Sequence, residues 1–578
     1  MFTSILILIV VKALATIRIS NIHFTRISAI VFLVSGLLIL NVLYIEPINN
    51  GIGIFSGLFQ ITNISQSLEL FLLIIGFIIL IGWPLNDSNY STDYSLIVLF
   101  SALGSSLLIS SLDLISLYLS LELQSFGLYI LSTLYKDSES STKAGLKYFL
   151  LGGLSSCIIL LGISIIYSNT GLTNLESIYI IISSTTVPYI IEGILLGLIL
   201  IIIGLLFKIS AAPLHNWSPD VYDEVPTIVT IWLTIIPKIS LLILLLELYL
   251  QINIYSSIEN IEISLLGWSS AGLDTNFLIN LFNINSLTAV NGQGSTAMIT
   301  IIKNIFLISS ILSLIIGTVV GLAQNKIKRL LAYSTISHIG FMLLALSINT
   351  EQSLDSFLFY LIQYILTNLN IFLILLGISY LKFNNYNVVS LYKKNYKFSP
   401  LSFKFIDIKY ISELNGLFIS NPFLSICLAI SLFSMAGVPP LIGFFSKQFV
   451  LYSALESGYY FISIIAIIVS VISASYYLKI IKVLYTNNTN NTNNIKKNNI
   501  NDGHGSTELP LLASNSSGVA PSATTNIINN TNSNNEIILS QFHSLMISIL
   551  SLFILLFILK PTLILNSTQV LSTTLFKL

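Results

Sequence analysis

Five ionisable side chains stand inside long apolar stretches of this sequence: Glu122, Lys208, Lys238, His338 and Lys447. The charged form of a buried lysine loses its hydration, whereas a nearby carboxylate favours that charged form. A lysine held between these two effects binds and releases a proton near neutral pH, and histidine titrates there with little perturbation. An acid, three lysines and a histidine in apolar surroundings therefore indicate a buried relay that handles protons.

Two of these lysines stand beside breaks in their apolar runs. Lys208 precedes the sequence Ala-Ala-Pro at 211–213, and Lys447 follows Gly-Val-Pro-Pro at 437–440. Proline removes a backbone donor and frees a carbonyl, which a membrane helix tolerates where the freed groups meet protein or water. Broken helices at matching places in two halves of a chain are typical of inverted-repeat transporters with an ion path near the middle of the bilayer. Two incidental proline kinks are the alternative.

The composition places the chain in a membrane. Of its 578 residues, 54% are hydrophobic and 9% charged, whereas about a quarter of the residues in a soluble domain are charged. Acidic and basic residues are equal in number, so net charge gives no indication of nucleic-acid binding. The two cysteines, Cys157 and Cys427, are too few and too far apart for an iron–sulfur cluster or a cysteine-based metal site.

The apolar runs predict an all-α integral membrane protein with about fourteen spans, since about twenty apolar residues cross a bilayer. The runs lie at roughly 2–18, 27–45, 67–83, 94–112, 113–134, 144–167, 189–212, 226–250, 301–323, 330–349, 354–380, 423–454, 458–485 and 540–560. The apolar N-terminus is expected to be a retained first span, because it has no signal-peptidase type ending.

These runs and the loops between them divide the chain into six segments. We predict an N-terminal three-helix segment at 1–90, a first repeat at 94–250, an outside loop at 251–300, a second repeat at 301–485, an Asn-rich inside loop at 486–536 and a C-terminal helix at 537–578. Alternating the spans from an outside N-terminus puts the basic loops inside and the acidic loops outside, as the positive-inside rule requires. Both termini then lie outside. The polar Asn-rich tract is expected to be largely mobile.

Glu122 and two other charged residues receive separate predictions. Glu122 is expected to be the acid at the centre of the membrane, and thus the natural partner of Lys208. Asp113 is expected to cap a helix between two spans. Lys147, near the end of its span, is expected to snorkel or to face a loop.

Four motifs give the chain a family resemblance. They are FKISAAPLHNWSPDVYDEVPT (207–227), TIIPKIS (234–240), NKIKRLLAYSTISHIGFML (325–343) and SLFSMAGVPPLIGFFSKQFVL (431–451). Together they resemble the antiporter-like proton-translocating subunits of respiratory complex I, NADH:ubiquinone oxidoreductase, and among these the subunit 2 type. The resemblance covers residues from about 95 to 485, while the flanks match by hydropathy alone.

The resemblance implies a fourteen-helix fold with two inverted five-helix repeats and two discontinuous helices. It carries the acid of the family onto Glu122, the lysine of the first broken helix onto Lys208, the next lysine onto Lys238 and the lysine of the second broken helix onto Lys447. One departure is Glu224, which stands where the family usually has glycine.

The function implied is that of a membrane-arm subunit, which couples NADH-to-ubiquinone electron transfer to proton pumping and has no redox centre of its own. NADH, FMN, iron–sulfur clusters and ubiquinone would be used by other subunits. The implied partners are other membrane-arm subunits and lipids, without nucleic acid, and the implied location is the mitochondrial inner membrane, with both termini on the intermembrane-space side. A stand-alone cation/proton antiporter and a structural scaffold, in which buried charges fix helix register, remain alternatives.

Overall fold

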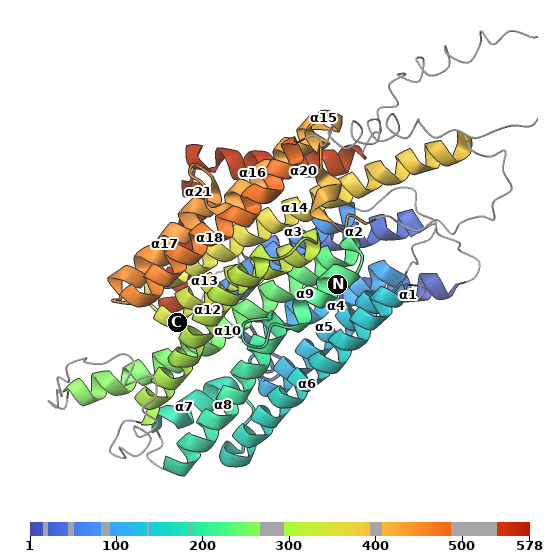
Figure 1. Ribbon diagram of the computed structural model, residues 1–578. Helices are drawn as coiled ribbons and strands as arrows, with labels where there is room; N and C mark the ends of the chain where they lie inside the picture. The colour runs from blue at the N-terminus through green and yellow to red at the C-terminus, as the bar shows by residue number, and fades with distance from the viewer. Residues whose placement is uncertain are drawn as a thin grey trace, which may run out of the picture.

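The computed structural model describes residues 1–14, 21–43, 51–82, 93–135, 138–184, 188–265, 294–392, 407–486 and 540–577. Most of its helices run side by side in one bundle (Figure 1). The loop predicted at 251–300 lies partly outside the described residues, and the Asn-rich loop at 486–536 lies almost wholly outside them.

The N-terminal segment contains three helices and a small β-hairpin. Its elements are α1 (Phe2–Ala13), α2 (Asn21–Val42), β1 (Ile52–Ile54), β2 (Phe59–Ile61) and α3 (Asn63–Ile81). The two strands are antiparallel, with Gly53 opposite Gln60. Backbone hydrogen bonds from Gln60 to Ser110 and from Leu112 to Leu58 attach the hairpin to the turn between α4 and α5. The sequence did not predict the hairpin, because three-residue strands are too short to produce an alternating pattern.

The first repeat contains five long helices. One short helix precedes the fourth of these, and another follows it. Its elements are α4 (Asp93–Ile109), α5 (Leu114–Thr133), α6 (Glu139–Thr170), α7 (Leu175–Ser184), α8 (Pro188–Ile209), α9 (Trp217–Glu224) and α10 (Thr227–Leu265). The stretch 94–134 forms two helices, as predicted, and the Asp113 carboxylate accepts a hydrogen bond from the Ile115 N–H (2.8 Å) as the expected cap. The short helix α7 was not predicted.

The second repeat has the same element order. Its elements are α12 (Gly294–Leu322), α13 (Ile327–Ile348), α14 (Glu351–Tyr392), η3 (Ile411–Leu414), α15 (Leu417–Ser420), α16 (Pro422–Ala436), α17 (Ile442–Glu456) and α18 (Tyr460–Tyr485). In both repeats the fourth long element is interrupted, as α8/α9 and as α16/α17. Because five is an odd number of spans, the second repeat starts from the opposite side of the membrane, as an inverted repeat does.

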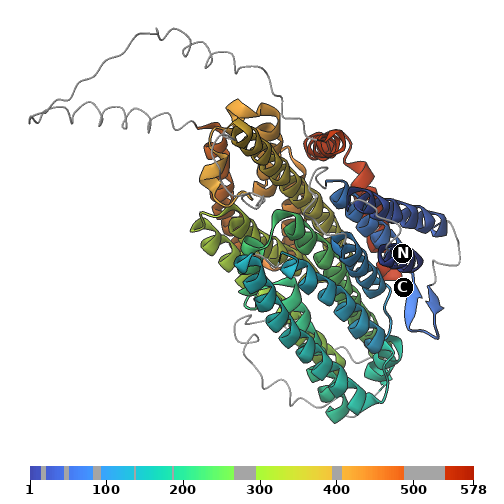
Figure 2. The ribbon, with the colours of Figure 1, turned by 90° about the vertical axis from the view of Figure 1, so that its right-hand side faces the viewer.

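The C-terminal segment, predicted as one helix, forms two. These are α20 (Gln541–Leu556) and α21 (Thr562–Lys577), joined by the short turn η4 (Phe557–Leu559). Pro561 stands between them and cannot continue the first helix. Both helices return to the N-terminal part of the bundle, where they pack on α3 and α14 (Figure 2).

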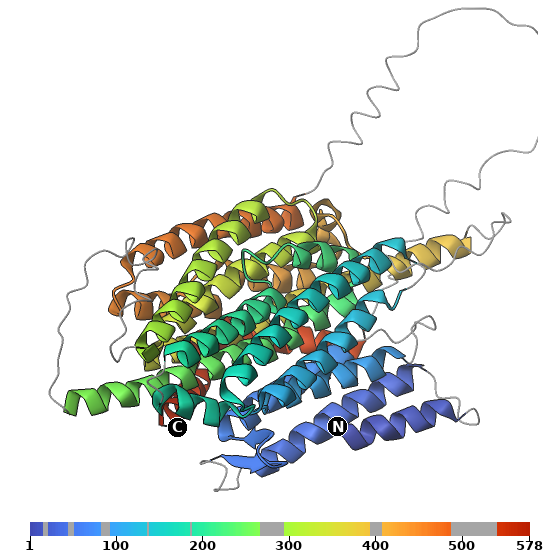
Figure 3. The ribbon, with the colours of Figure 1, turned by 90° about the horizontal axis from the view of Figure 1, so that it is seen from below.

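Within the described residues, eleven helices are long and apolar enough to cross a membrane, and α1, α4 and α16 are shorter apolar helices. The all-α membrane fold is therefore confirmed, while the count of fourteen stays a prediction. The apolar windows of α10 and α13 are wholly buried and that of α14 nearly so, whereas most of the windows of α2, α6 and α18 is exposed. Figure 3 shows the blue N-terminal helices along one side of the bundle and the orange helices α16–α18 along the other.

Ion pairs tie the two repeats together at one end of the bundle. The Lys328 ammonium, 3% exposed, donates to the Asp407 carboxylate and to the Val225 carbonyl oxygen (both 2.8 Å). Asp407 also accepts hydrogen bonds from the backbone N–H (3.1 Å) and the hydroxyl (2.9 Å) of Thr227. This carboxylate thus caps the N-terminus of α10 while neutralising a buried cation on α13.

A second set of pairs joins α9 to α6 and α13. Asp220 pairs with Lys147 of α6 and with Arg329 of α13 (2.8 Å), and Asp223 pairs with Lys326 (2.6 Å). Lys147, expected to snorkel or to face a loop, has this acidic partner on the short helix α9. The short helix behind the first break is therefore held by charges from both repeats.

We expect Asp407→Ala to destabilise the protein by about 3 kcal/mol, because removing one partner of a buried ion pair costs about 3–5 kcal/mol. The change leaves the Val225 carbonyl oxygen as the remaining described partner of the Lys328 ammonium, and it removes the side chain that caps α10. The thermal unfolding midpoint of the detergent-solubilised protein measures the effect.

Glu139→Ala is the matched control, because its partner Lys143 and Glu139 itself are both largely exposed. Exposed pairs contribute little to stability, so the midpoint of this variant stays that of the wild type. Equal midpoints for Asp407→Ala and Glu139→Ala would contradict a structural role for the buried pair.

Candidate functional site

The first helix break has a defined local structure. Ser210 adopts φ 68° at the end of α8, and the Ala211 N–H bonds back to the Leu206 carbonyl oxygen (3.0 Å). The indole N–H of Trp217, at the start of α9, donates to the Phe207 carbonyl oxygen (2.9 Å). This carbonyl oxygen, in the last turn of α8, also accepts a hydrogen bond from the Ser210 N–H (3.1 Å), so α9 supplies it with a second donor. The break therefore fixes the turn of α8 that carries Lys208.

Lys208 and Glu122 are in contact, as the sequence predicted. The Lys208 ammonium lies 3.5 Å from a Glu122 carboxylate oxygen, and both side chains are largely buried. Ser125, one turn along α5, donates to the other oxygen of the same carboxylate (3.3 Å). The distance between Lys208 and Glu122 is long for a charge-assisted hydrogen bond. The carboxylate therefore stabilises the charged lysine without holding it in a tight ion pair.

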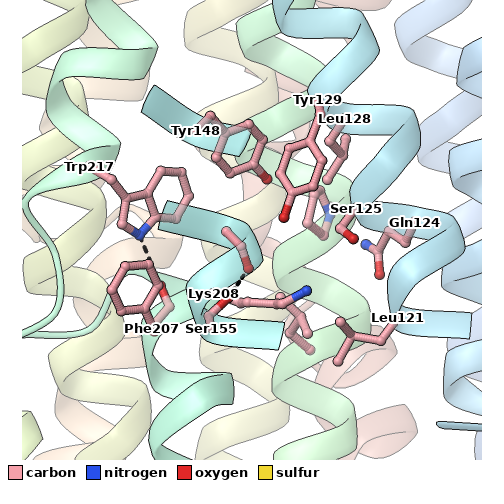
Figure 4. A pocket seen from close by; sticks show the side chains of 13 residues that line it. Leu121, Gln124, Ser125, Leu128, Tyr129, Tyr148, Ser155, Phe207, Lys208 and Trp217 are labelled. Atoms are coloured by element: carbon pink, nitrogen blue, oxygen red, sulfur yellow. Dashed lines mark hydrogen bonds between the residues drawn. The ribbon is translucent and has the colours of Figure 1, made fainter. Parts of the chain in front are cut away.

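A small cavity adjoins Lys208 between α5, α6, α8 and α10. Its volume is about 20 Å³, enough for one water molecule. Figure 4 shows the Lys208 amine pointing toward the α5 side chains that line this cavity, with Tyr148 and Trp217 on the opposite wall. Gln124, which also lines the cavity, exchanges hydrogen bonds with Ser240 of α10 (3.0 and 3.1 Å). A polar connection therefore leads from the Lys208 cavity to the helix that carries Lys238.

Lys238 is buried at the centre of the bundle and is held by tyrosines. Its ammonium is 3.4 Å from the Tyr364 hydroxyl oxygen, and it lies 5.6 and 5.7 Å from the ring centres of Tyr222 and Tyr364. Cation–π contacts of this length stabilise an ammonium that has lost its water. Pro237, inside α10, removes a backbone donor immediately beside this lysine.

His338 lies on α13 with both ring nitrogens occupied by tyrosine hydroxyls. Nδ1 is 2.7 Å from the hydroxyl of Tyr360, and Nε2 is 3.2 Å from that of Tyr477. A neutral imidazole donates through one nitrogen and accepts through the other, whereas the protonated ring donates through both. Because a hydroxyl can serve in either role, this arrangement accommodates both protonation states. The ring also lies within electrostatic range of Lys238 and Lys447.

Lys447 is stabilised by the second helix break. Its ammonium donates to the carbonyl oxygens of Met435 (3.0 Å) and Ala436 (2.9 Å) at the C-terminus of α16, and it lies 5.9 Å from the Phe341 ring centre. The C-terminal carbonyls of a helix carry partial negative charge. Gly437 follows with φ 86°, and a Cβ there would come within 3.2 Å of the ammonium, so glycine makes room for the lysine.

The five predicted residues thus form one direct pair and three separate stations. Glu122 and Lys208 touch, whereas the described contacts of Lys238, His338 and Lys447 are with tyrosines, backbone carbonyls and a phenylalanine ring. The role of these five residues as a proton relay stays a prediction.

Sequence reasoning missed a polar stripe on α14. Tyr360, Gln363, Tyr364, Thr367 and Asn368 recur at helical spacing and are all buried, and Gln363 accepts a hydrogen bond from Ser446, beside Lys447 (3.3 Å). The spacing i, i+3, i+4, i+7, i+8 marks one face of a helix and was available from the sequence. The stripe places polar groups of α14 between Lys238 and the second break.

Two more acids of the described residues lie inside membrane-spanning helices, although neither is at the middle of its span. Glu69 lies inside the span of α3 and Glu247 inside the span of α10.

Comparison with known proteins identifies the family of the chain. The profile of the family described as "NADH:quinone oxidoreductase/Mrp antiporter, TM" matches residues 111–282 and 277–473, which is one match for each repeat. NADH-ubiquinone oxidoreductase chain 2 of Rhizopus oryzae is 47% identical over 80% of this chain and 81% of its own length. NADH-quinone oxidoreductase subunit N of Wolbachia sp. subsp. Brugia malayi is 34% identical over 74% of this chain and 77% of its own.

A solved structure supports the fold independently. A chain of respiratory complex I from Thermus thermophilus superposes with a TM-score of 0.63, covering 98% of this chain and 99% of that one at 22% identity. The resemblance found in the four sequence motifs is therefore confirmed. This chain belongs to the NADH:quinone oxidoreductase/Mrp antiporter family of transmembrane subunits, in the branch of NADH-ubiquinone oxidoreductase chain 2.

Proposed function

We propose that this chain is a proton-translocating membrane-arm subunit of NADH:ubiquinone oxidoreductase. Its partners are then the other membrane-arm subunits, with lipid covering the exposed apolar faces of helices such as α2, α6 and α18. The names of its relatives and the all-helical fold support this function. The location follows as the mitochondrial inner membrane, which the chain crosses many times.

One observation carries the proposal: three buried lysines have three different kinds of stabilising partner. A carboxylate faces Lys208, a hydroxyl and two aromatic rings surround Lys238, and two backbone carbonyls receive Lys447. An ammonium inside a membrane needs compensation, yet none of these environments is a tight, fully paired ion pair. Each site therefore favours a charged lysine only moderately, which lets the proton leave again.

In this proposal each group has its own role. Glu122 keeps Lys208 charged at 3.5 Å, and lengthening of this pair favours proton release. The cavity and the Gln124–Ser240 contact provide a polar path from Lys208 to α10. Lys238 receives the proton at the centre, and His338 exchanges it through the hydroxyls that hold its ring.

Lys447 is the last station. It binds the proton beside the C-terminal carbonyls of α16, on the side of the bundle away from the N-terminal helices. We propose that electron transfer from NADH to ubiquinone takes place in other subunits, which hold FMN and the iron–sulfur clusters. In the described part of this chain, no group of three or more His, Cys, Asp or Glu side chains is placed to bind a metal ion.

Two alternative functions can be distinguished from this proposal by experiment. The matching family also includes Mrp antiporters, so a stand-alone cation/proton antiporter would use the same residues. Purification separates the two functions, because an antiporter migrates apart from a flavin- and iron–sulfur-containing assembly. In a structural scaffold, the buried charges would only fix helix register, and their replacement would change assembly without changing pumping.

We expect Lys238→Ala to lower proton translocation by the assembled enzyme at least about 100-fold, the low end of what a positioned proton-transfer group contributes. The spans stay inserted, because the substitution removes a charge from an apolar core. Acidification of the lumen of proteoliposomes during NADH oxidation, normalised to assembled complex, measures the effect.

Lys143→Ala serves as the matched control, since Lys143 is exposed in a pair with Glu139, and it is expected to pump at the wild-type rate. Full pumping by Lys238→Ala would rule out the relay.

We also propose that both termini face the intermembrane space, which follows from the charge pattern of the loops. In a Cys157→Ser background, cysteines introduced at Thr3 and at Asn325, both exposed, report the two sides. An impermeant maleimide added outside intact inner membranes is expected to label Thr3→Cys and to spare Asn325→Cys. The reverse labelling pattern would show the opposite orientation.

A further inference from the structure

Tyr364 on α14 contacts two titratable groups that belong to different repeats. Its hydroxyl oxygen is 3.4 Å from the Lys238 ammonium of α10, in the first repeat. Its ring centre is 5.6 Å from that of His338 on α13, in the second repeat. Tyr364 is itself 1% exposed. It therefore occupies the junction between the repeats, where a proton leaving Lys238 must cross.

The Tyr364 hydroxyl has further partners that define its direction. The side-chain amide of Asn368, one turn along α14, donates to its oxygen (3.3 Å). Thr335 of α13 lies within hydrogen-bonding reach of the same hydroxyl, and this threonine lies one helical turn before His338. Lys238 and Asn368 both donate to the Tyr364 oxygen, and Thr335 donates its own proton to the Ala332 carbonyl oxygen (2.7 Å). The Thr335 oxygen is therefore left as an acceptor for the Tyr364 proton.

Asn368 adds an independent observation. It is fully buried, and its side-chain carbonyl oxygen has no hydrogen-bond partner in the structure. A buried acceptor without a partner is costly and is uncommon in native proteins. An unoccupied acceptor beside the Tyr364 hydroxyl is consistent with a site through which a proton or a water molecule passes.

The contacts of Lys238 indicate that a hydroxyl accepts its proton. Its described contacts are the Tyr364 hydroxyl and the faces of the Tyr222 and Tyr364 rings, and none of these is a carboxylate. Aromatic faces stabilise the ammonium, but they do not accept its proton. The hydroxyl oxygen is the group in direct contact that can do so.

We propose that the Tyr364 hydroxyl transfers the proton from Lys238 to the second repeat, an inference that rests on the proposed function. As the N–H bond of the ammonium breaks, a bond forms to the hydroxyl oxygen, and the original O–H proton leaves toward Thr335 and the His338 side. Lys238 becomes a neutral amine, the tyrosine stays neutral throughout, and one positive charge moves from the first repeat to the second. Rotation about the phenolic C–O bond resets the hydroxyl.

Tyr364→Phe tests this directly in the assembled complex. Phenylalanine keeps the ring that faces Lys238 and His338 and removes the hydroxyl alone. Proton translocation per assembled complex, measured in proteoliposomes during NADH oxidation, is expected to fall at least about 100-fold. Wild-type pumping by Tyr364→Phe would overturn the proposal.

Two further variants control for packing. Tyr249→Phe removes a hydroxyl from another buried tyrosine, which packs on Phe306 about three helical turns along α10 from Lys238, and it is expected to pump at the wild-type rate. Asn368→Leu keeps Tyr364 but removes the amide that orients its hydroxyl, so we expect a loss of about tenfold, smaller than that of Tyr364→Phe. If Tyr364→Phe assembles poorly, wild-type pumping by Asn368→Leu would count against the proposal.

The outcomes separate this inference from the proposed function. Loss of pumping in Lys238→Ala together with normal pumping in Tyr364→Phe would keep the relay and refute the tyrosine step. Normal pumping in both variants would refute the relay itself. Loss in both variants, with normal pumping in Tyr249→Phe, is the result that the proposal requires.

Discussion

Compensation of ammonium charge inside a hydrocarbon layer is the constraint on which this structure depends. Lys208, Lys238 and Lys447 are each at least nine-tenths buried, where an isolated charge is costly. The chain compensates them with a carboxylate, with tyrosines and with helix-end carbonyls, respectively. A tightly paired lysine would hold its proton permanently, and an unpaired one would rarely bind it. The intermediate arrangement at all three sites is what the proposed proton exchange requires.

The helix breaks and the buried helices follow from the same constraint. Breaking α16 exposes the carbonyls that receive Lys447, while the α8 break is completed by Trp217. The helices that carry Lys238, His338 and Tyr364 are those most deeply buried from lipid. At one end of the bundle, Asp407 joins the start of α10 to α13, so a single carboxylate connects the two repeats there.

Much of this was predictable from the sequence, for physical reasons. Long apolar runs fix helices in a bilayer, and Lys208 and Glu122 were expected to meet because each needs the other in such surroundings. The tyrosines were not found, because a tyrosine in an apolar helix is ordinarily a packing residue, and hydropathy does not register its hydroxyl. The acid at Glu247 was missed because it lies near the end of an apolar run. The partners of Asp407 and Asp220 were beyond reach, because these acids lie outside the apolar runs, where burial does not demand a partner.

The central claim is that polar groups connect Lys208 to Lys447 through the middle of the bundle. A high-resolution map of the hydrated, assembled complex tests it most directly. The account predicts ordered water in the cavity between Lys208 and Gln124, and hydroxyl or water contacts continuing from Lys238 through Tyr364 and His338 toward Lys447. A dry, apolar gap between Lys238 and His338 in every state of the enzyme, with the Tyr364 hydroxyl turned away, would contradict it.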